Sequence, residues 1–229
     1  MKLQTAAIYQ IADFNGLSQL TLQCANPVIF VPGQYIALWL DGQPDALPYT
    51  PFIQSCQGNL LTLAPDKLPA WQPGHVLGWR GPLGQACALT APARRLALYS
   101  RCEHPGPLMP FIHAATQDRM DIVFSSAASG GFPAWLPAQI EWQDASRLSE
   151  LAAWADVLVA CLPRQALAED LLKLSELPAS ITQGGAYVLV VSDMPCAGMA
   201  QCGVCDILAR RKYIHVCQDG PLFPLKDLI

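Results

Sequence analysis

Residues 1–90 alternate short apolar runs with turn residues. The runs are a few positions long and rich in leucine, isoleucine and valine, and glycine, proline, asparagine or aspartate separates them. This punctuation is typical of short strands joined by turns, and regular spacing of such strands predicts a small antiparallel β-barrel. The expected strands are Leu3–Ile11, Leu17–Cys24, Tyr35–Leu40, Tyr49–Ile53, Leu60–Ala64 and Val76–Trp79.

The pattern changes period from about residue 94. Strongly apolar strands alternate there with segments in which apolar residues recur at helical spacing, which predicts a parallel α/β sheet. The expected strands are Leu96–Tyr99, Asp121–Phe124, Ile140–Trp142, Val157–Ala160 and Tyr187–Val191. The expected helical faces consist of Leu108, Phe111, Ile112 and Ala115, then of Leu148, Leu151, Ala152 and Ala155, then of Leu167, Leu171, Leu172 and Leu174.

This change of period divides the chain into three expected parts and makes the fold class multi-domain α+β. Residues 1–90 are expected to form the barrel, residues 94–192 the α/β domain, and residues 193–229 a separate C-terminal segment. The linker is expected within Leu89–Arg95, where Pro92 interrupts the pattern.

Composition removes several classes of function. The net charge is -4 and there is no long basic run, so the chain offers no concentrated positive face for nucleic acid. No segment approaches the roughly 20 consecutive apolar residues of a membrane span. The N-terminus lacks the features of a secretory signal, so the expected location is the cytoplasm. Hydrophobic residues make up 52% of the chain, and we interpret the surplus as an interface buried in a hetero-oligomer.

The nine cysteines are unevenly distributed. Cys102 and Cys161 are interpreted as buried small residues at strand ends, and Cys24, Cys56 and Cys87 are also scattered. The other four, which fall within the last 34 residues, are Cys196, Cys202, Cys205 and Cys217.

The spacing of these four residues is C-x5-C-x2-C-x11-C. Plant-type [2Fe-2S] sites use C-x4-C-x2-C and a distant fourth cysteine, so the four cysteines are the predicted ligands of such a cluster, with a bulge in the first gap. Ala197, Gly198, Ala200 and Gly203 are small enough for a tight loop.

Two other interpretations of the four thiols stay open. A structural zinc site also takes four cysteines, but it usually pairs two C-x2-C knuckles and this chain has one. The thiols can also be unliganded. Between the third and fourth cysteines, the run Arg210–Lys212 is either a solvated hairpin tip or a guide for an acidic partner.

Several segments together resemble the electron-transfer subunit of the NAD-dependent dihydroorotate dehydrogenases, a branch of the ferredoxin reductase-like flavoproteins. They are Met194–Cys196, Cys202–Cys205, Val216–Phe223, Pro32–Tyr35 and Gly81–Gly84. The resemblance implies FAD on the barrel, a nicotinamide on the α/β domain, and a cluster that passes single electrons to a flavoprotein dehydrogenase subunit in pyrimidine biosynthesis. Catalysis proper then belongs to that partner, and this chain supplies no catalytic residue.

The flavin signature departs from the pattern of that family. Its arginine, proline, aromatic and Ser/Thr positions read Leu47, Pro48, Tyr49 and Thr50 here. Leucine forgoes a charge-assisted contact with the pyrophosphate worth about 1.5–3 kcal/mol. The resemblance still implies FAD contacts, and the candidates are Pro48, Tyr49, Thr50, Gly81 and Pro82. The alternative for Tyr49 is an aromatic residue of the barrel core.

The nicotinamide motifs depart further. The family's glycine-rich turn is replaced by Ser100–Pro107, and its Cys-Gly-Pro by Cys161–Pro163, so no NAD(P) site is expected. The sequence therefore predicts a [2Fe-2S] electron-transfer subunit. Two alternatives remain: an assembly or scaffold subunit without cofactors, and a complete FAD-dependent NADH oxidoreductase with unusual motifs.

Overall fold

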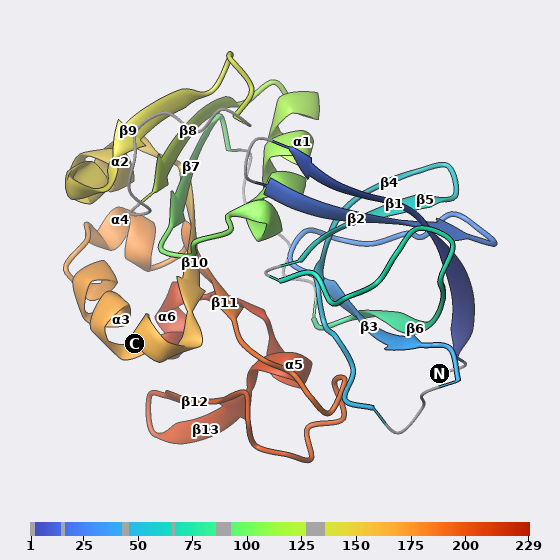
Figure 1. Ribbon diagram of the computed structural model, residues 1–229. Coiled ribbons are helices and arrows are strands. Elements are labelled where there is room, and N and C mark those ends of the chain that lie inside the picture. Colours follow the sequence, from blue (N-terminus) through green and yellow to red (C-terminus); the bar gives the residue numbers. More distant parts are fainter. Residues whose placement is uncertain (1–2, 15–16, 43–45, 66, 86–92, 127–135) are drawn as a thin grey trace.

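Six antiparallel strands close into a barrel in the N-terminal part of the computed structural model, in the order β1-β2-β5-β4-β3-β6 (Figure 1). The structure describes residues 3–14, 17–42, 46–65, 67–85, 93–126 and 136–229. The strands are β1 (Gln4–Phe14), β2 (Leu17–Cys24), β3 (Tyr35–Leu40), β4 (Phe52–Gln57), β5 (Leu60–Ala64) and β6 (Val76–Leu83). Alternate side chains such as Leu20, Leu22 and Leu61 fill the interior, which confirms the predicted barrel.

One barrel strand begins later than predicted. Tyr49 exchanges two backbone hydrogen bonds with Leu38, at 2.8 and 2.9 Å, but only as an isolated bridge. Pro51 follows, and a proline has no N–H to continue the ladder. The strand β4 therefore begins at Phe52, and Tyr49 lies in the segment that leads into it.

A six-stranded sheet forms the second part, in the order β14-β11-β10-β7-β8-β9. Its strands are β7 (Arg95–Ser100), β8 (Asp121–Ser126), β9 (Glu141–Asp144), β10 (Val157–Pro163), β11 (Ala186–Val191) and β14 (Leu222–Pro224). All neighbours are parallel except β14, which pairs antiparallel with β11. The chain runs from β7 outward to β9 and then returns to β10. The order of the strands thus reverses between β7 and β10, which is where open α/β sheets bind their ligands.

The helical segments connect these strands (Figure 1). The α-helices are α1 (Met109–Gln117), α2 (Leu148–Trp154), α3 (Leu167–Ser175), α4 (Ala179–Thr182), α5 (Val216–Asp219) and α6 (Leu225–Leu228), and the 3-10 helices are η1 (Gly106–Leu108), η2 (Ala145–Arg147) and η3 (Arg164–Ala166). No helix in the described ranges is long and apolar enough to cross a membrane.

The predicted faces of α1 and α2 are essentially those observed, but the face of α3 was partly wrong. Leu172 is 67% exposed, whereas Leu167, Leu171 and Leu174 are buried. The buried stripe follows the i, i+3, i+4, i+7 spacing, and its i+3 position is Asp170. The acidic residue Asp170, and not Leu172, therefore completes the buried face of α3.

Residues 192–229, which follow β11, form a loop, the hairpin β12 (Asp206–Ala209) and β13 (Lys212–His215), and then α5, β14 and α6. Through β14 this segment joins the sheet of the α/β part. Arg210 and Arg211 lie at the tip of the hairpin, where Arg210 donates to the carbonyl groups of Lys226 and Ile229. Of the predicted linker, residues 89–92 lie outside the described part of the chain.

The turn before α1 packs directly on the barrel. A Cβ added to Gly106 would lie 2.5 Å from Cβ of Ala64 in β5, whereas one added to Gly184 would meet nothing within 4 Å. We expect Gly106→Val to lower the free energy of unfolding by about 2 kcal/mol, because overpacking forces the two parts to separate. Urea unfolding measures the change, and Gly184→Val is the matched control. Equal effects of the two substitutions would contradict this account of the contact.

Candidate redox site between the barrel and the C-terminal loop

The four C-terminal cysteines lie in two contacting pairs. The Cys202 side chain is close enough to Cys196 to lower the pKa of its thiol, and the Cys217 side chain does the same to Cys205. The backbone N–H of Cys217 also donates to Cys205 Sγ at 3.4 Å. Three of these cysteines are buried and Cys202 is exposed. The spacing in the sequence therefore corresponds to proximity in space within each pair.

The loop of residues 194–205 wraps around these sulfurs. Backbone amides of Gln201, Cys202 and Met199 point at the Cys196 sulfur, and the amide of Ala200 points at Cys217. Such wrapping requires left-handed backbone. Positive φ angles occur at Ala197 (50°), Gly198 (81°), Ala200 (53°) and Gly203 (70°). Alanine is disfavoured in this conformation, so the surrounding contacts hold the loop in a conformation that it would not adopt alone.

These contacts shift the pKa values of the thiols. Burial raises the pKa of Cys196, but the amides of Gln201 and Cys202 and the Cys202 thiol outweigh it and leave the pKa at about 7. The Cys217 thiol lowers the pKa of Cys205 to about 6 against the effect of burial, and the same contact raises the pKa of Cys217. Each pair therefore favours one thiolate near neutral pH, and the thiolate is the form that binds metal.

Two side chains of the barrel hold the loop and the fourth cysteine of the site, Cys217. The hydroxyl of Tyr35 in β3 donates to the Cys217 carbonyl at 2.8 Å, and Arg80 in β6 donates to the Ala197 carbonyl. Tyr35 is fully buried, and burial, reinforced by the nearby thiols, raises its pKa well above the usual range. It therefore remains a hydrogen-bond donor at all physiological pH values. The site is thus built from both ends of the chain.

A cavity of about 350 Å³ adjoins the loop. The barrel contributes Leu47, Pro48, Tyr49 and Thr50, the end of β11 contributes Val191, and the loop contributes Met194, Pro195 and Val204. The ring of Tyr49 packs edge-on against Trp71, with centroids 5.7 Å apart. This volume is within the usual range for small-molecule sites.

The structure brings together three of the five expected flavin contacts, Pro48, Tyr49 and Thr50. Gly81 and Pro82 are not among the residues that line this cavity. They lie in β6, where a Cβ on Gly81 would be 2.6 Å from Cγ2 of Ile36, so the glycine allows β3 to approach closely. Pro195 and Val204 also line the cavity but were not predicted as flavin contacts, although each directly precedes a cysteine of the loop.

In the described part of the chain, no group of three or more His, Cys, Asp or Glu side chains has the arrangement of a metal site. The sulfurs contact one another as pairs. Any metal centre that uses all four of them must therefore bridge two pairs.

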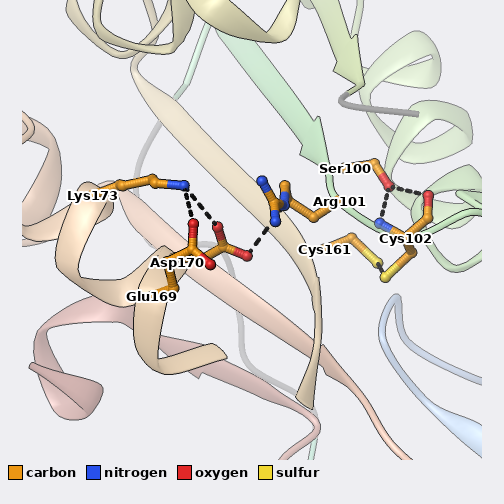
Figure 2. A network of polar contacts seen from close by, with 7 residues as sticks. All are labelled: Ser100, Arg101, Cys102, Cys161, Glu169, Asp170 and Lys173. Atoms are coloured by element: carbon orange, nitrogen blue, oxygen red, sulfur yellow. Dashed lines mark hydrogen bonds and ion pairs between the residues drawn. The ribbon is translucent and has the colours of Figure 1, made fainter. Parts of the chain in front are cut away.

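A second cavity, of about 420 Å³, opens at the carboxyl ends of β7 and β10. Lys67, Arg101, Cys102, Glu103 and Pro163 are among its lining residues. Figure 2 shows the polar network around Arg101, which lines this cavity and reaches Asp170 at 3.4 Å.

The turn beside this cavity is a poor phosphate cradle. Pro105, Gly106 and Pro107 are buried, Gly106 abuts the barrel, and the two prolines lack an N–H. Glu103 adds a negative charge nearby. The residues present therefore do not fit the pyrophosphate of a nicotinamide dinucleotide at this turn.

No known protein-family profile matches the sequence, and no curated protein matches it. Solved structures do match. An NADH-dependent reduced ferredoxin-NADP oxidoreductase, studied for flavin-based electron bifurcation, has 14% identity and a TM-score of 0.73 over 98% of this chain and 89% of its own. The FAD/NAD-binding domain of nitric oxide dioxygenase from Vibrio cholerae has 11% identity and a TM-score of 0.62, over 82% of this chain and 98% of its own.

The ferredoxin reductase of carbazole 1,9a-dioxygenase has 11% identity and a TM-score of 0.59, over 82% of this chain and 68% of its own. At such low identity these likenesses establish the fold. The barrel and the parallel-sheet part together form a ferredoxin reductase-like fold.

Proposed function

We propose that this chain binds one [2Fe-2S] cluster through Cys196, Cys202, Cys205 and Cys217 and relays electrons between a flavin and a partner protein. The observation that carries the proposal is the pairing of the four thiols beneath a loop whose amides point at sulfur. A [2Fe-2S] cluster takes four cysteine ligands, and the two pairs of thiolates would together supply them. Hydrogen bonds to the sulfurs then tune the reduction potential.

The cavity beside the loop suits the ring of an FAD. Tyr49 offers a flat aromatic wall, and Thr50 offers a hydroxyl to the polar part of the cofactor. Pro195 and Val204 line the same cavity and are bonded directly to Cys196 and Cys205. A bound flavin would supply two-electron chemistry, and the cluster would supply one-electron transfer. Pro195 and Val204 would therefore provide a short route for electrons between the flavin cavity and the thiols.

The surrounding polypeptide shields three of the four thiols from solvent. Cys196, Cys205 and Cys217 are buried, while Cys202 and Met199 face solvent. A partner can therefore approach the loop at Cys202 and Met199. Direct reduction by NAD(P)H is not part of the proposal, because the turn at Gly106 does not fit a pyrophosphate. Electrons then enter or leave through a protein partner, such as the flavin subunit of a dihydroorotate dehydrogenase-like complex.

Anaerobic purification followed by analysis of iron, acid-labile sulfide, zinc and flavin tests the proposal. We expect two irons and two sulfides per chain, with the broad visible absorption of a [2Fe-2S] cluster. A colourless protein that contains stoichiometric zinc, or no metal at all, would overturn the electron-transfer role and favour a structural subunit.

The missing arginine at Leu47 gives a prediction for the flavin. Leu47 lines the cavity and is 78% exposed, so a longer side chain has room to reach a pyrophosphate. We expect Leu47→Arg to tighten FAD binding about tenfold through a charge-assisted hydrogen bond. Quenching of flavin fluorescence measures the dissociation constant. Leu172→Arg, on a leucine of α3 that is 67% exposed, is the control, and identical affinities for both variants would contradict the assignment of this cavity to FAD.

A further inference from the structure

The sulfurs of Cys102 and Cys161 touch at the reversal point of the sheet. Cys161 belongs to β10, and Cys102 lies two residues beyond the end of β7. The Cys161 thiol donates to Cys102 Sγ at 3.6 Å, although the residues are 59 positions apart in the sequence. Figure 2 shows both side chains pointing toward each other from neighbouring strands. The two thiols are therefore already in contact before any rearrangement.

Backbone hydrogen bonds fix this contact. Arg101 N donates to the Cys161 carbonyl at 2.9 Å, which ties the two segments together next to the sulfurs. Ser100 Oγ accepts from Cys102 N at 3.2 Å and donates to the Cys102 carbonyl at 3.3 Å. The turn after β7 is thus held in one conformation. Covalent bonding requires the sulfurs to approach to about 2.05 Å, and rotation of the side chains can supply that movement.

The two thiols differ in their access to solvent. Cys102 is 8% exposed and lines the cavity of about 420 Å³, whereas Cys161 is 0% exposed and is not among the residues that line it. A small oxidant that enters the cavity therefore meets Cys102 first. This asymmetry is the arrangement of an attacking thiol and a resolving thiol.

We propose that Cys102 and Cys161 form a redox-active dithiol that is oxidised to a disulfide by a low-molecular-weight disulfide entering this cavity. The Cys102 thiolate attacks one sulfur of the small disulfide, forms a mixed disulfide and expels one small thiolate. The Cys161 thiolate then attacks the Cys102 sulfur and expels the second. Two protein thiols lose two electrons and two protons, and one small disulfide gains both and becomes two thiols.

This site shares no residue with the proposed cluster. Either site can therefore be disrupted while the other remains intact. The redox role of Cys102 and Cys161 does not depend on the electron-transfer role proposed for the cluster. It gives a chemical use to two cysteines that the sequence alone presents as packing residues. It also places this redox role at the cavity whose neighbouring turn is a poor phosphate cradle.

The test exposes the purified protein to glutathione buffers of increasing oxidised fraction, followed by acid quenching, alkylation, trypsin digestion and mass spectrometry. The two cysteines lie in separate tryptic peptides, Cys102–Arg119 and Leu148–Arg164. We expect these peptides to become linked as the buffer becomes oxidising, with loss of their alkylated forms, and dithiothreitol to restore them. The cysteines of the proposed cluster lie in other peptides, so loss of iron does not mimic this result.

Three variants assign the order of the steps. In Cys161→Ser we expect Cys102 to accumulate as the glutathione adduct, because nothing resolves the mixed disulfide. In Cys102→Ser we expect Cys161 to remain alkylated throughout, because it is not reached. Cys56→Ser should leave the linkage unchanged. If wild-type peptides stay separately alkylated across the full range of buffers, or if Cys161 takes the adduct in Cys102→Ser, the proposal is overturned.

Discussion

Replacing Cys205 with serine is expected to remove iron from the purified protein. Cys205 is buried, and its sulfur accepts from the backbone N–H of Cys217. These two cysteines form the pair of the proposed site in which both members are buried. A serine hydroxyl does not ionise near neutral pH and does not replace a thiolate as an iron ligand. Because even changes in the outer shell of a metal site cost roughly 10–100-fold in affinity, loss of a ligand should lower iron and sulfide per chain at least tenfold.

Cys56→Ser is the matched control for this loss. Cys56 lies in β4, accepts from Val28 N at 3.4 Å and donates to the Gly58 carbonyl at 3.4 Å, and serine can make both bonds. The control should keep its iron and its visible spectrum. Retention of iron by Cys205→Ser, together with an unchanged spectrum, would show that the metal, if any, lies elsewhere.

Replacing Arg101 with methionine is expected to destabilise the fold by about 3 kcal/mol at neutral pH. Its guanidinium faces the Asp170 carboxylate at 3.4 Å, and Asp170 is only 2% exposed (Figure 2). Removing one partner leaves a buried charge whose remaining partner, Lys173, is 3.9 Å away. Burial already raises the pKa of Asp170, and Arg101 opposes that shift. Urea unfolding of the wild type and the variant measures the loss.

The pH dependence follows from the sign of that shift. A carboxyl group with a raised pKa in the folded state favours folding at low pH, and that contribution is lost as the pH rises through the folded pKa. The cost of Arg101→Met should therefore shrink as the pH falls through the Asp170 pKa. Arg147→Met, which breaks an exposed pair with Glu150, is the control and should cost about 0–1 kcal/mol. If the double variant Arg101→Met/Asp170→Leu lost as much unfolding free energy as Arg101→Met alone, the pairing of Arg101 with Asp170 would be contradicted.

The strands could be predicted from the sequence because their periodicity is strong. The segments Leu17–Cys24, Tyr35–Leu40 and Leu60–Ala64 have the observed bounds, since glycine or proline turns delimit them on most sides. A hairpin tip at Arg210–Lys212 was one of two interpretations of the basic run, but the bounds of β12 and β13 were not predicted, because each strand has four residues and the basic run obscures any alternation. Short elements at the end of the chain depend on contacts that no local pattern reveals.

The contacts between the candidate site residues were likewise predictable only in part. Spacing alone placed Cys196 with Cys202, because only five residues separate them. The contact of Cys102 with Cys161 was invisible, because it requires β10 to lie beside β7 rather than beside β9. The pair Arg101 and Asp170 was hidden for the same reason. Chemistry created by the order of strands cannot be read from distances along the chain.

The bond from the Tyr35 hydroxyl to the Cys217 carbonyl spans 182 residues, and the bond from Arg80 to the Ala197 carbonyl spans 117. Ribosomes synthesise the barrel long before the cysteine loop, so the loop meets a scaffold that is already formed. A peptide excised from residues 193–229 would lack both donors, and its strained alanines would relax. Loading of iron thus reports on completion of the whole molecule, and a chain that stalls before its tail stays empty.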